Sequence, residues 1–429
     1  METIAYASQQ EIELYQTALL KKQLLYLAEH SPFYKRLFAK NRIDVLEIQS
    51  LQDLQRLPTT SKNDLQRYND DFLCVQAQEV IDYCTTSGTL GAPVTFGLTE
   101  ADLDRLAQNE SCSFETVGVK KGDIVQLMTT MDRRFMAGLA YFLGLRKLGA
   151  GVVRVGSGIP QMQWDSIFKY KPKYLIAVPS FILKMIEFAE QHNMDYKNSS
   201  VEAVICIGEA LRKPNMENTV LTDRILAKWD IKLHSTYAST EMGAAFTECQ
   251  HFQGGHVQPD LIITEIVDSQ DLAVPDGDCG ELVITTLGVE GLPLLRFKTG
   301  DMVRKHSSPC ACGRNTYRIG PVEGRLQHMV KYKGTTLYPP AMHDVLAGFP
   351  EVLLHQIIVS SNEIGTDEIL IRLATEKRSD ALMNAIKDHF RAKLRVAPRL
   401  EFCDFDVLQQ SVFHPLSRKP ITFVDNRQQ

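Results

Sequence analysis

Apolar residues recur at intervals of three and four along residues 11–38. This spacing predicts an amphipathic helix. Ser31 and Pro32 divide it into two, because serine is a favourable N-cap and proline suits the first helical turn. Residues 57–65 predict a turn followed by another helix. We expect these helices to form a packing layer without a functional role.

Short apolar runs alternate with helical stretches in the middle of the chain. Helices are predicted at 99–116 and 135–148, and strands at 123–128, 149–155, 174–178 and 201–207. This alternation indicates a parallel sheet covered by helices. Ligands bind such sheets at the carboxyl ends of the strands. The residues that follow each strand are therefore the first candidates for chemistry.

The pattern changes after residue 324. Strands at 354–359, 368–373 and 399–405, with helices that begin at Ala341 and Asp380, outline a β-α-β-β-α-β arrangement. The sequence thus predicts an α/β protein with a large domain of helix-covered, mostly parallel sheets over residues 1–324. A small α+β domain is expected over residues 325–429.

The composition is that of an ordinary globular protein, with 429 residues of which 44% are hydrophobic and 23% charged. The net charge of -5 comes without a block of like charge, which argues against a nucleic acid or an anionic membrane as the main partner. No apolar run reaches the roughly 18 residues of a membrane span, and the N-terminus lacks the features of a signal peptide. We expect a cytoplasmic protein, in which nine cysteines are reduced thiols.

A run rich in hydroxyl groups and glycine lies between two strand-like segments at residues 83–98. Main-chain N–H groups at glycine turns can surround phosphate oxygens, and threonine and serine hydroxyls add donors. The residues concerned are Thr85, Thr86, Ser87, Gly88, Thr89 and Gly91. Taken alone, such a run is equally typical of a hairpin loop.

Further candidates follow the later strands. Gly208, Glu209 and Ala210 come after the strand at 201–207, and the motif Tyr237 to Gly243 follows a strand predicted at 232–236. Tyr237 could cover a purine, Thr240 could bond a phosphate and Glu241 could hold a divalent cation. The alternatives are a core aromatic residue for Tyr237 and a helix start for Glu241.

An acidic residue ends a further apolar segment. In residues 294–301, Asp301 comes directly behind Gly300, which we expect to be a turn at the end of a strand. A carboxylate in this position can accept hydrogen bonds from the two hydroxyls of a ribose. Turn chemistry alone would also favour a Gly-Asp pair.

The order of these motifs resembles that of the adenylate-forming enzymes, and within them most of all the phenylacetate-CoA ligase family. The resemblance covers nearly the whole chain, through SPFYKRLF, LPTTSKNDL, TTSGTLGAPV, YASTEMG, LPLLRFKTGD, CACGR and KPITFVDNR. It implies that the loop at 86–91 holds the ATP β- and γ-phosphates. It places Gly208, Glu209, Ala210 and Tyr237 at adenine, with Ser239 in the same motif.

The resemblance also assigns residues to the remaining parts of the nucleotide. Thr240 would contact the α-phosphate, Glu241 would bind Mg²⁺, and Asp301 with Arg325 would bind the ribose. Lys419 falls where the family has a C-terminal lysine that bridges the acid and the α-phosphate, stabilising the transition state.

The implied reaction has two halves. A carboxylate attacks the α-phosphorus of ATP to give an acyl-adenylate, and the thiol of coenzyme A then displaces AMP. In the family the small domain rotates between the halves, withdrawing Lys419 and bringing the loop at Lys333 and Gly334 to the thiol.

This chain departs from the family pattern at three positions. It has Gln327 and His328 where relatives have acidic residues, and Ala92 where they often have lysine. These differences leave open a relative that only binds the nucleotide.

A second constellation is suited to a metal. Cys310 and Cys312 have the spacing of a zinc knuckle, and Cys249 lies with His251 and His256 in another segment. Three sulfurs and one imidazole would complete a tetrahedral structural zinc site, and some members of the resembled family carry Cys and His at these places. We favour His256 over His251 as the fourth ligand. The alternative is a set of unlinked reduced cysteines.

The acid pocket is expected in residues 128–136, where methionine and phenylalanine suit a flat aromatic or medium apolar acid. Arg133 and Arg134 could meet an anionic substrate or a carrier arm, or face solvent. We therefore expect an AMP-forming ligase for an aromatic or aryl-alkyl acid with coenzyme A as acceptor. Alternatives are loading of an acyl carrier protein, and adenylylation alone as in enzymes that act on a deazaflavin cofactor. A homodimer is left open.

Overall fold

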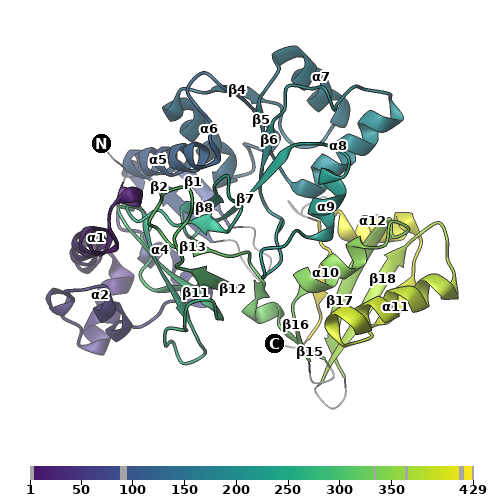
Figure 1. Cartoon of the computed structure of the whole chain (residues 1–429). Helices are drawn as coiled ribbons and strands as arrows, with labels where there is room; N and C mark the ends of the chain where they lie inside the picture. Colours follow the sequence, from purple (N-terminus) through teal and green to yellow (C-terminus); the bar gives the residue numbers. More distant parts are fainter. Residues whose placement is uncertain (1–3, 87–93, 333–334, 363–365, 415–419, 428–429) are drawn as a thin grey trace. The chain divides into compact units, whose positions relative to one another are not determined.

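The computed structural model describes residues 4–86, 94–332, 335–362, 366–414 and 420–427. The chain folds into two compact units (Figure 1). The first comprises Met1–Glu217, Arg224–Thr299 and Val303–Pro321, and the second Asn218–Asp223, Gly300–Met302 and Val322–Gln429. The functional boundary between 324 and 325 stays a prediction.

Helices form most of the N-terminal segment and alternate with strands in the rest of the first unit. The helices are α1 (Gln9–His30), α2 (Pro32–Asn41), α3 (Lys62–Arg67), α4 (Asn69–Phe72), α5 (Glu100–Val117), α6 (Met136–Leu148), α7 (Pro160–Tyr170) and α8 (Pro179–Gln191). Short 3₁₀ helices are η1 (Ile4–Tyr6), η2 (Val45–Glu47), η3 (Gln52–Arg56) and η4 (Ala77–Glu79). Helix α9 (Val220–Leu226) has residues in both units.

Local sequence signals explain where several of these helices begin. The Ser31 side chain accepts a hydrogen bond from the Tyr34 N–H and Pro32 is the first helical residue, as the sequence predicts. Thr99 caps α5 in a capping box with Asp102, and Gly118 ends that helix with φ of 110°. The predicted helices at 99–116 and 135–148 are therefore confirmed.

A large mixed sheet runs through the first unit. Its strands are β3 (Ile124–Leu127), β4 (Gly151–Arg154), β5 (Tyr174–Ala177), β6 (Ala203–Cys206), β7 (Lys232–Ser239), β8 (Ala244–Glu248), β9 (Gly255–His256), β10 (Ile262–Val267), β11 (Cys279–Thr286), β12 (Phe297–His306) and β13 (Arg318–Ile319). The order is β10-β11-β12-β13-β9-β8-β7-β6-β5-β3-β4, and β14 (Gly324–Arg325) pairs with β12.

Half of this sheet matches the sequence prediction. Strands β4, β3, β5, β6 and β7 pair in parallel, and every residue of β5 and β6 is buried. The change of direction occurs within β7, which is parallel to β6 in its first half and antiparallel to β8 in its second. The α/β fold is confirmed, whereas the antiparallel half was not predicted.

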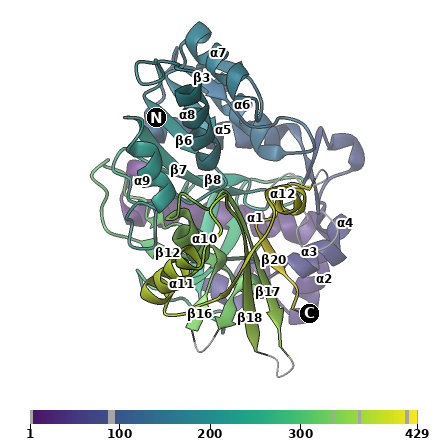
Figure 2. The same ribbon diagram turned by 90° about the vertical axis from the view of Figure 1, so that its right-hand side faces the viewer.

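The second unit has its own sheet and core. Its elements are η5 (Leu326–His328), β15 (Val330–Tyr332), β16 (Thr335–Leu337), α10 (Pro339–Ala347), β17 (Leu354–Ser361), β18 (Asp367–Ala374), α11 (Asp380–Leu394), β19 (Arg399–Phe402), α12 (Phe405–Val412) and β20 (Phe423–Asp425). The sheet order is β19-β18-β17-β20, and Figure 2 shows β20 beside β17. Its core joins Ile357, Ile371, Ile386 and Phe390, each at most 2% exposed.

The second unit confirms the strands at 354–359 and 368–373 and the helices near Ala341 and Asp380, whereas the strand predicted at 399–405 ends at Phe402 and Phe405 begins α12. Helix α12 and strand β20 were not predicted, because both are short. Among the residues that the structure describes, no helix is long and apolar enough to cross a membrane.

Candidate active site

The loop rich in hydroxyl groups lies at the tip of a hairpin. Strands β1 (Asp82–Thr85) and β2 (Thr95–Leu98) pair antiparallel, as predicted for the segments that frame the loop. Thr86 continues the pairing, since its N–H donates to the Val94 carbonyl and its hydroxyl accepts from the Val94 N–H at 3.2 Å. Ser87, Gly88, Thr89, Gly91 and Ala92 lie outside the described residues.

This hairpin contacts the loop in which the acid pocket is expected. The Thr85 N–H donates to the Arg134 carbonyl at 3.0 Å. Arg133 and Arg134 both have positive φ, of 56° and 57°, and both side chains are exposed. Gly138 allows the start of α6 to approach this loop, because a Cβ there would lie 2.0 Å from the Thr130 carbonyl oxygen. The β1–β2 hairpin and the 128–136 loop are thus neighbours.

The turn after β6, which contains Gly208, is held by the N-terminus of α8. Gly208 has φ of 79°, a conformation that favours glycine. The Glu209 carboxylate accepts from the Ser180 N–H at 2.9 Å and from the Ser180 hydroxyl at 2.7 Å, in the first turn of α8. A carboxylate is favourable there because of the helix dipole. The Glu209 side chain is therefore engaged with α8, and Ala210 follows it directly.

Tyr237 lies on the strand next to this turn. The predicted strand 232–236 is three residues too short, because β7 continues to Ser239 through pairing with β8. Tyr237 is partly exposed and its ring meets Phe246 edge-on at 5.8 Å. Since β6 and β7 are adjacent parallel strands, Gly208 and Tyr237 come from neighbouring strands at the same edge of the sheet.

Thr240 and Glu241 lie in the tight turn between β7 and β8. Ser239 closes this turn, with its hydroxyl accepting from the Met242 N–H and its carbonyl accepting from the Gly243 N–H, both at 3.3 Å. Glu241 does not begin a helix, so that alternative is wrong. Both side chains are partly exposed.

A hollow is lined both by the turn that carries Thr240 and Glu241 and by strand β2 of the hairpin. Its walls come from β2, α5, the start of α6, the 240–243 turn and the segment after β11. The lining residues include Phe96, Leu98, Asp102, Arg105, Leu106, Met136, Thr240, Glu241, Thr286, Val289 and Leu292. Most of the lining residues are apolar, and Thr240 and Glu241, the predicted phosphate and metal ligands, are among the polar ones.

Asp301 does not follow a turn at the end of a strand. The strand-end prediction is wrong, because β12 begins only at Phe297 and runs to His306, so that Asp301 is a mid-strand residue. Gly300 still has positive φ, 77°, which is why the pair resembled a turn. Asp301 pairs with Arg325 of β14 in register and accepts from its Nε at 3.1 Å. The two predicted ribose ligands thus contact each other.

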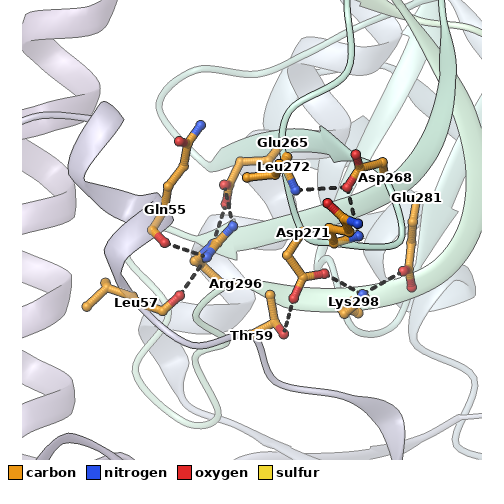
Figure 3. Close-up of polar contacts among 11 residues, drawn as sticks. Gln55, Leu57, Thr59, Glu265, Asp268, Asp271, Leu272, Glu281, Arg296 and Lys298 are labelled. Carbon is orange, nitrogen blue, oxygen red and sulfur yellow. Dashed lines mark hydrogen bonds and ion pairs between the residues drawn. The ribbon is translucent and has the colours of Figure 1, made fainter. Parts of the chain in front are cut away.

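The same segment carries two cations that sequence reasoning did not single out. Arg296 donates to both carboxylate oxygens of Glu265, at 2.9 and 3.0 Å, and to the Leu57 carbonyl at 2.5 Å. Lys298 lies 2.6 Å from Asp271 and 3.1 Å from Glu281, and Thr59 also donates to Asp271 (Figure 3).

This network joins two distant sequence motifs. The Thr60 N–H donates to the Arg296 carbonyl, and the Lys298 N–H donates to the Thr60 carbonyl. The segment LPTTSKNDL is therefore bound along LPLLRFKTGD, as Figure 3 shows for Leu57 and Thr59. A bidentate, buried arginine pair fixes geometry better than a flexible surface pair does. The network holds the start of β12.

Three cysteines and one histidine converge in the first unit. One ligand atom from each of Cys249, His256, Cys310 and Cys312 lies within 4.8 Å of the others. The Sγ atoms of Cys249 and Cys310 are 3.6 Å apart, and Cys312 Sγ is 3.4 Å from His256 Nε2. In a tetrahedral zinc site these edges are about 3.8 Å and about 3.6 Å, given Zn–S of about 2.3 Å and Zn–N of about 2.0 Å.

The protonation states of His256 and Cys312 fit metal ligation, whereas Cys249 is a neutral thiol as long as no metal is bound. Burial lowers the pKa of His256 to about 3, helped by Arg314 and Arg318, so the imidazole is neutral. Its Nδ1 lies 3.0 Å from the Thr316 hydroxyl, which leaves Nε2 directed at the cysteines. Burial works to raise the pKa of Cys312, but hydrogen bonds from Arg314 and Cys310 outweigh it and the pKa is lowered. Burial raises the pKa of Cys249 to about 12.

In the second unit, the segment after Arg325 is fixed by the C-terminal strand. Arg427 donates to the carbonyls of Gln327 and Met329, at 3.1 and 2.7 Å, and pairs with Asp367 and Asp425. Burial lowers the pKa of His328, whose ring packs on Phe423 at 4.9 Å. Lys333, Gly334 and Lys419 lie outside the described residues.

Comparison with known proteins agrees with this arrangement. Residues 18–290 match the family described as AMP-binding enzyme. A phenylacetate-coenzyme A ligase of Thermus thermophilus is 30% identical over 373 residues, 85% of this chain and 81% of the relative. The corresponding ligase of Aromatoleum evansii is 26% identical, covering 94% of this chain and 93% of its own.

A solved structure shares the fold over almost the whole length. The crystal structure of 2-hydroxyisobutyryl-CoA ligase with R3-HIB-AMP has a TM-score of 0.83 and 23% identity, covering 98% of this chain and 90% of that one. The chain is thus an AMP-binding enzyme, and within that class it belongs to the phenylacetate-CoA ligase family. It is an acid-thiol ligase that activates a carboxylic acid with ATP and transfers the acyl group to coenzyme A.

Proposed function

We propose that the acid is an aromatic or aryl-alkyl carboxylate and that the residues named above divide the two half-reactions between them. The observation that carries the proposal is that one hollow is lined both by β2 of the hairpin and by the turn with Thr240 and Glu241. A phosphate hairpin and a metal-binding carboxylate must be neighbours if both are to engage one triphosphate.

In the first half-reaction, the hairpin loop with Thr86 holds the β- and γ-phosphates and Thr240 contacts the α-phosphate. Glu241 would hold Mg²⁺, which would supply positive charge beside the phosphates. Gly208, Glu209, Ala210 and Tyr237 enclose adenine, while Asp301 and Arg325 hold the ribose. The Glu209 carboxylate is engaged by Ser180, so adenine contacts there come from the main chain.

Lys419 supplies the cation that bridges the carboxylate and the α-phosphate as pyrophosphate leaves. Such a group stabilises charge that develops in the transition state. Ser87, Gly88, Thr89 and Gly91 add main-chain and hydroxyl donors. In the second half-reaction the loop at Lys333 and Gly334 meets the thiol, and the small domain moves as a hinged body.

The acid pocket lies in the 128–136 loop. Its support is the hydrogen bond from Thr85 to Arg134, which brings that loop beside the phosphate hairpin. Met131 and Phe135 are partly buried and Met136 is fully buried, whereas the two arginines are exposed. An apolar, aromatic wall favours a flat acid. The relatives named as phenylacetate-coenzyme A ligases support the same class.

The acceptor thiol is that of free coenzyme A. Loading of an acyl carrier protein is the second candidate, because Arg133 and Arg134 are exposed at the loop and could meet an acidic carrier. One assay distinguishes the two acceptors: thioester formation is compared with free coenzyme A and with holo carrier protein. The mass of the protein in solution distinguishes a homodimer from a monomer.

Zinc is the metal that the four-residue cluster fits. The fit rests on the two interatomic distances, on a neutral imidazole, and on a hydrogen bond in which His256 Nδ1–H donates to the Thr316 hydroxyl and so orients the ring. All four tetrahedral positions are taken by protein, which is typical of a structural site. Cys249, His256, Cys310 and Cys312 would tie the β8–β9 connection to the loop that precedes β13.

Acid-dependent exchange of labelled pyrophosphate into ATP tests the substrate class. We expect phenylacetate and related aryl-alkyl acids to support exchange at least about tenfold better than fatty or amino acids of equal size, since one misplaced methylene costs 1–3 kcal/mol in an apolar pocket. If a long-chain fatty acid or an amino acid supported faster exchange than the aryl-alkyl acids, that result would contradict the aromatic assignment.

A further inference from the structure

Helix α5 carries a row of buried polar side chains that points into the protein. Asp102, Arg105 and Asn109 follow one another at intervals of three and four, so they lie on one face of the helix. Their exposures are 3%, 8% and 0%. We call them the α5 polar row. A helix of ordinary amphipathic type would turn such residues to solvent.

Arg105 binds main chain rather than a carboxylate. Its Nε donates to the Leu287 carbonyl at 2.7 Å, Nη1 to the Gly243 carbonyl at 2.6 Å and Nη2 to the Leu261 carbonyl at 2.5 Å. The planar guanidinium group of Arg105 thus binds three separate segments of the chain. Burial lowers the pKa of Arg105 to about 10, so it stays charged at neutral pH.

Asn109, one helical turn after Arg105, binds the main chain just beyond Gly243. Its Oδ1 accepts from the Ala245 N–H at 3.0 Å, and its Nδ2 donates to Glu110 at 3.0 Å. Asp102, at the other end of the row, accepts from the N–H groups of Glu290 and Gly291 at 2.9 and 2.8 Å. The row therefore bonds to two walls of the hollow that contains Glu241.

The contacts bracket the turn that carries Thr240 and Glu241. Ser239 closes the turn on its N-terminal side, while Arg105 and Asn109 hold Gly243 and Ala245 on its C-terminal side. Gly243 has φ of 51°, and a Cβ there would lie 3.1 Å from Arg105 Nη1. Met242 is fully buried. The main chain of Glu241, between Ser239 and Gly243, therefore has little conformational freedom.

We propose that the α5 polar row positions Glu241. By holding this carboxylate in place, the row would determine how much Mg²⁺ increases the affinity of the enzyme for ATP. The proposal rests on the proposed role of Glu241. In this proposal, Arg105 and Asn109 do not contact the substrate. They fix the main chain on which the metal-binding carboxylate stands, because a 1 Å displacement of such a group is costly to the reaction.

The test is the gain in ATP affinity that Mg²⁺ gives the full-length protein. An Arg105→Lys variant keeps the charge but loses the fork, so it can hold only one of the three carbonyls. We expect Mg²⁺ to strengthen ATP binding roughly tenfold in the wild type and less than about twofold in Arg105→Lys, with metal-free ATP affinity unchanged. Asn109→Ala should shift the same ratio in the same direction.

Ser113→Ala is the matched control. Ser113 lies one turn further along α5 and is 2% exposed, and its hydroxyl has no hydrogen-bond partner among the described residues. The variant should keep the wild-type ratio. An Arg105→Lys protein that also keeps this ratio, or one that loses metal-free ATP affinity to the same extent, would overturn the positioning role.

The half-reactions separate this proposal from the ligase assignment. With supplied acyl-adenylate and coenzyme A, which need no metal-bound ATP, Arg105→Lys should form thioester within about twofold of the wild type. Equal losses in both halves would mark Arg105 as merely structural. Absence of acid-dependent AMP formation by the wild type would instead refute the proposed function, while the ATP titration would still decide the role of the row.

Discussion

A Lys419→Ala variant is expected to lose adenylation on the order of 10²–10³-fold while retaining thioester formation from supplied acyl-adenylate. The reason is that a cation placed where charge develops in the transition state contributes this much, and the proposed mechanism uses Lys419 only in the first half-reaction. The measurement is acid-dependent pyrophosphate exchange, followed by a separate assay of acyl-adenylate with coenzyme A.

Lys393→Ala serves as the control for this prediction. Lys393 is an exposed lysine on α11 of the same unit, so its loss removes an equal charge without affecting the reaction. Both half-reactions should match the wild type. If Lys419→Ala retained wild-type exchange, the assignment of this lysine would have to be abandoned.

A Cys310→Ser variant is expected to lose bound zinc and to unfold roughly 5–10 °C earlier than the wild type. A ligand in a closed site couples metal binding to folding, and the loss of a few kcal/mol shifts the midpoint of a domain of this size by that amount. Metal content after dialysis and thermal unfolding, each on the full chain, are the two measurements.

Cys403→Ser is matched to it, because Cys403 is a free cysteine of the second unit outside the cluster. It should keep about one zinc per chain. The pair His256→Ala and His251→Ala decides the fourth ligand, with loss of metal expected only for His256. A wild type that is fully folded and free of metal would end the zinc proposal.

The parallel half of the large sheet could be predicted from sequence because its central strands β5 and β6 are buried on both faces and are therefore continuous in their apolar residues. The cysteine cluster could be predicted as well, since Cys-X-Cys spacing is uncommon without a metal. The structure brings Cys249, His256, Cys310 and Cys312 together as that pattern indicated.

Other features depend on contacts between distant segments. Asp301 was placed at a strand end because Gly-Asp is typical of turns, yet pairing with Arg325 extends β12 through it. The α5 polar row was not recognised, because polarity alone suggests exposure to solvent, and its partners are main-chain groups more than 130 residues away along the chain. Arg296 and Lys298 were missed for the same reason.

The central claim is that the acid is activated as an acyl-adenylate and passed to coenzyme A. Its most direct test is a single reaction of ATP and coenzyme A with phenylacetate whose carboxylate is labelled with ¹⁸O. Attack of the carboxylate on the α-phosphorus, followed by thiol attack on the acyl carbon, leaves one carboxylate oxygen in AMP. We expect one ¹⁸O in each AMP and an equal amount of phenylacetyl-CoA. Label in inorganic phosphate, or AMP without label, would contradict the account.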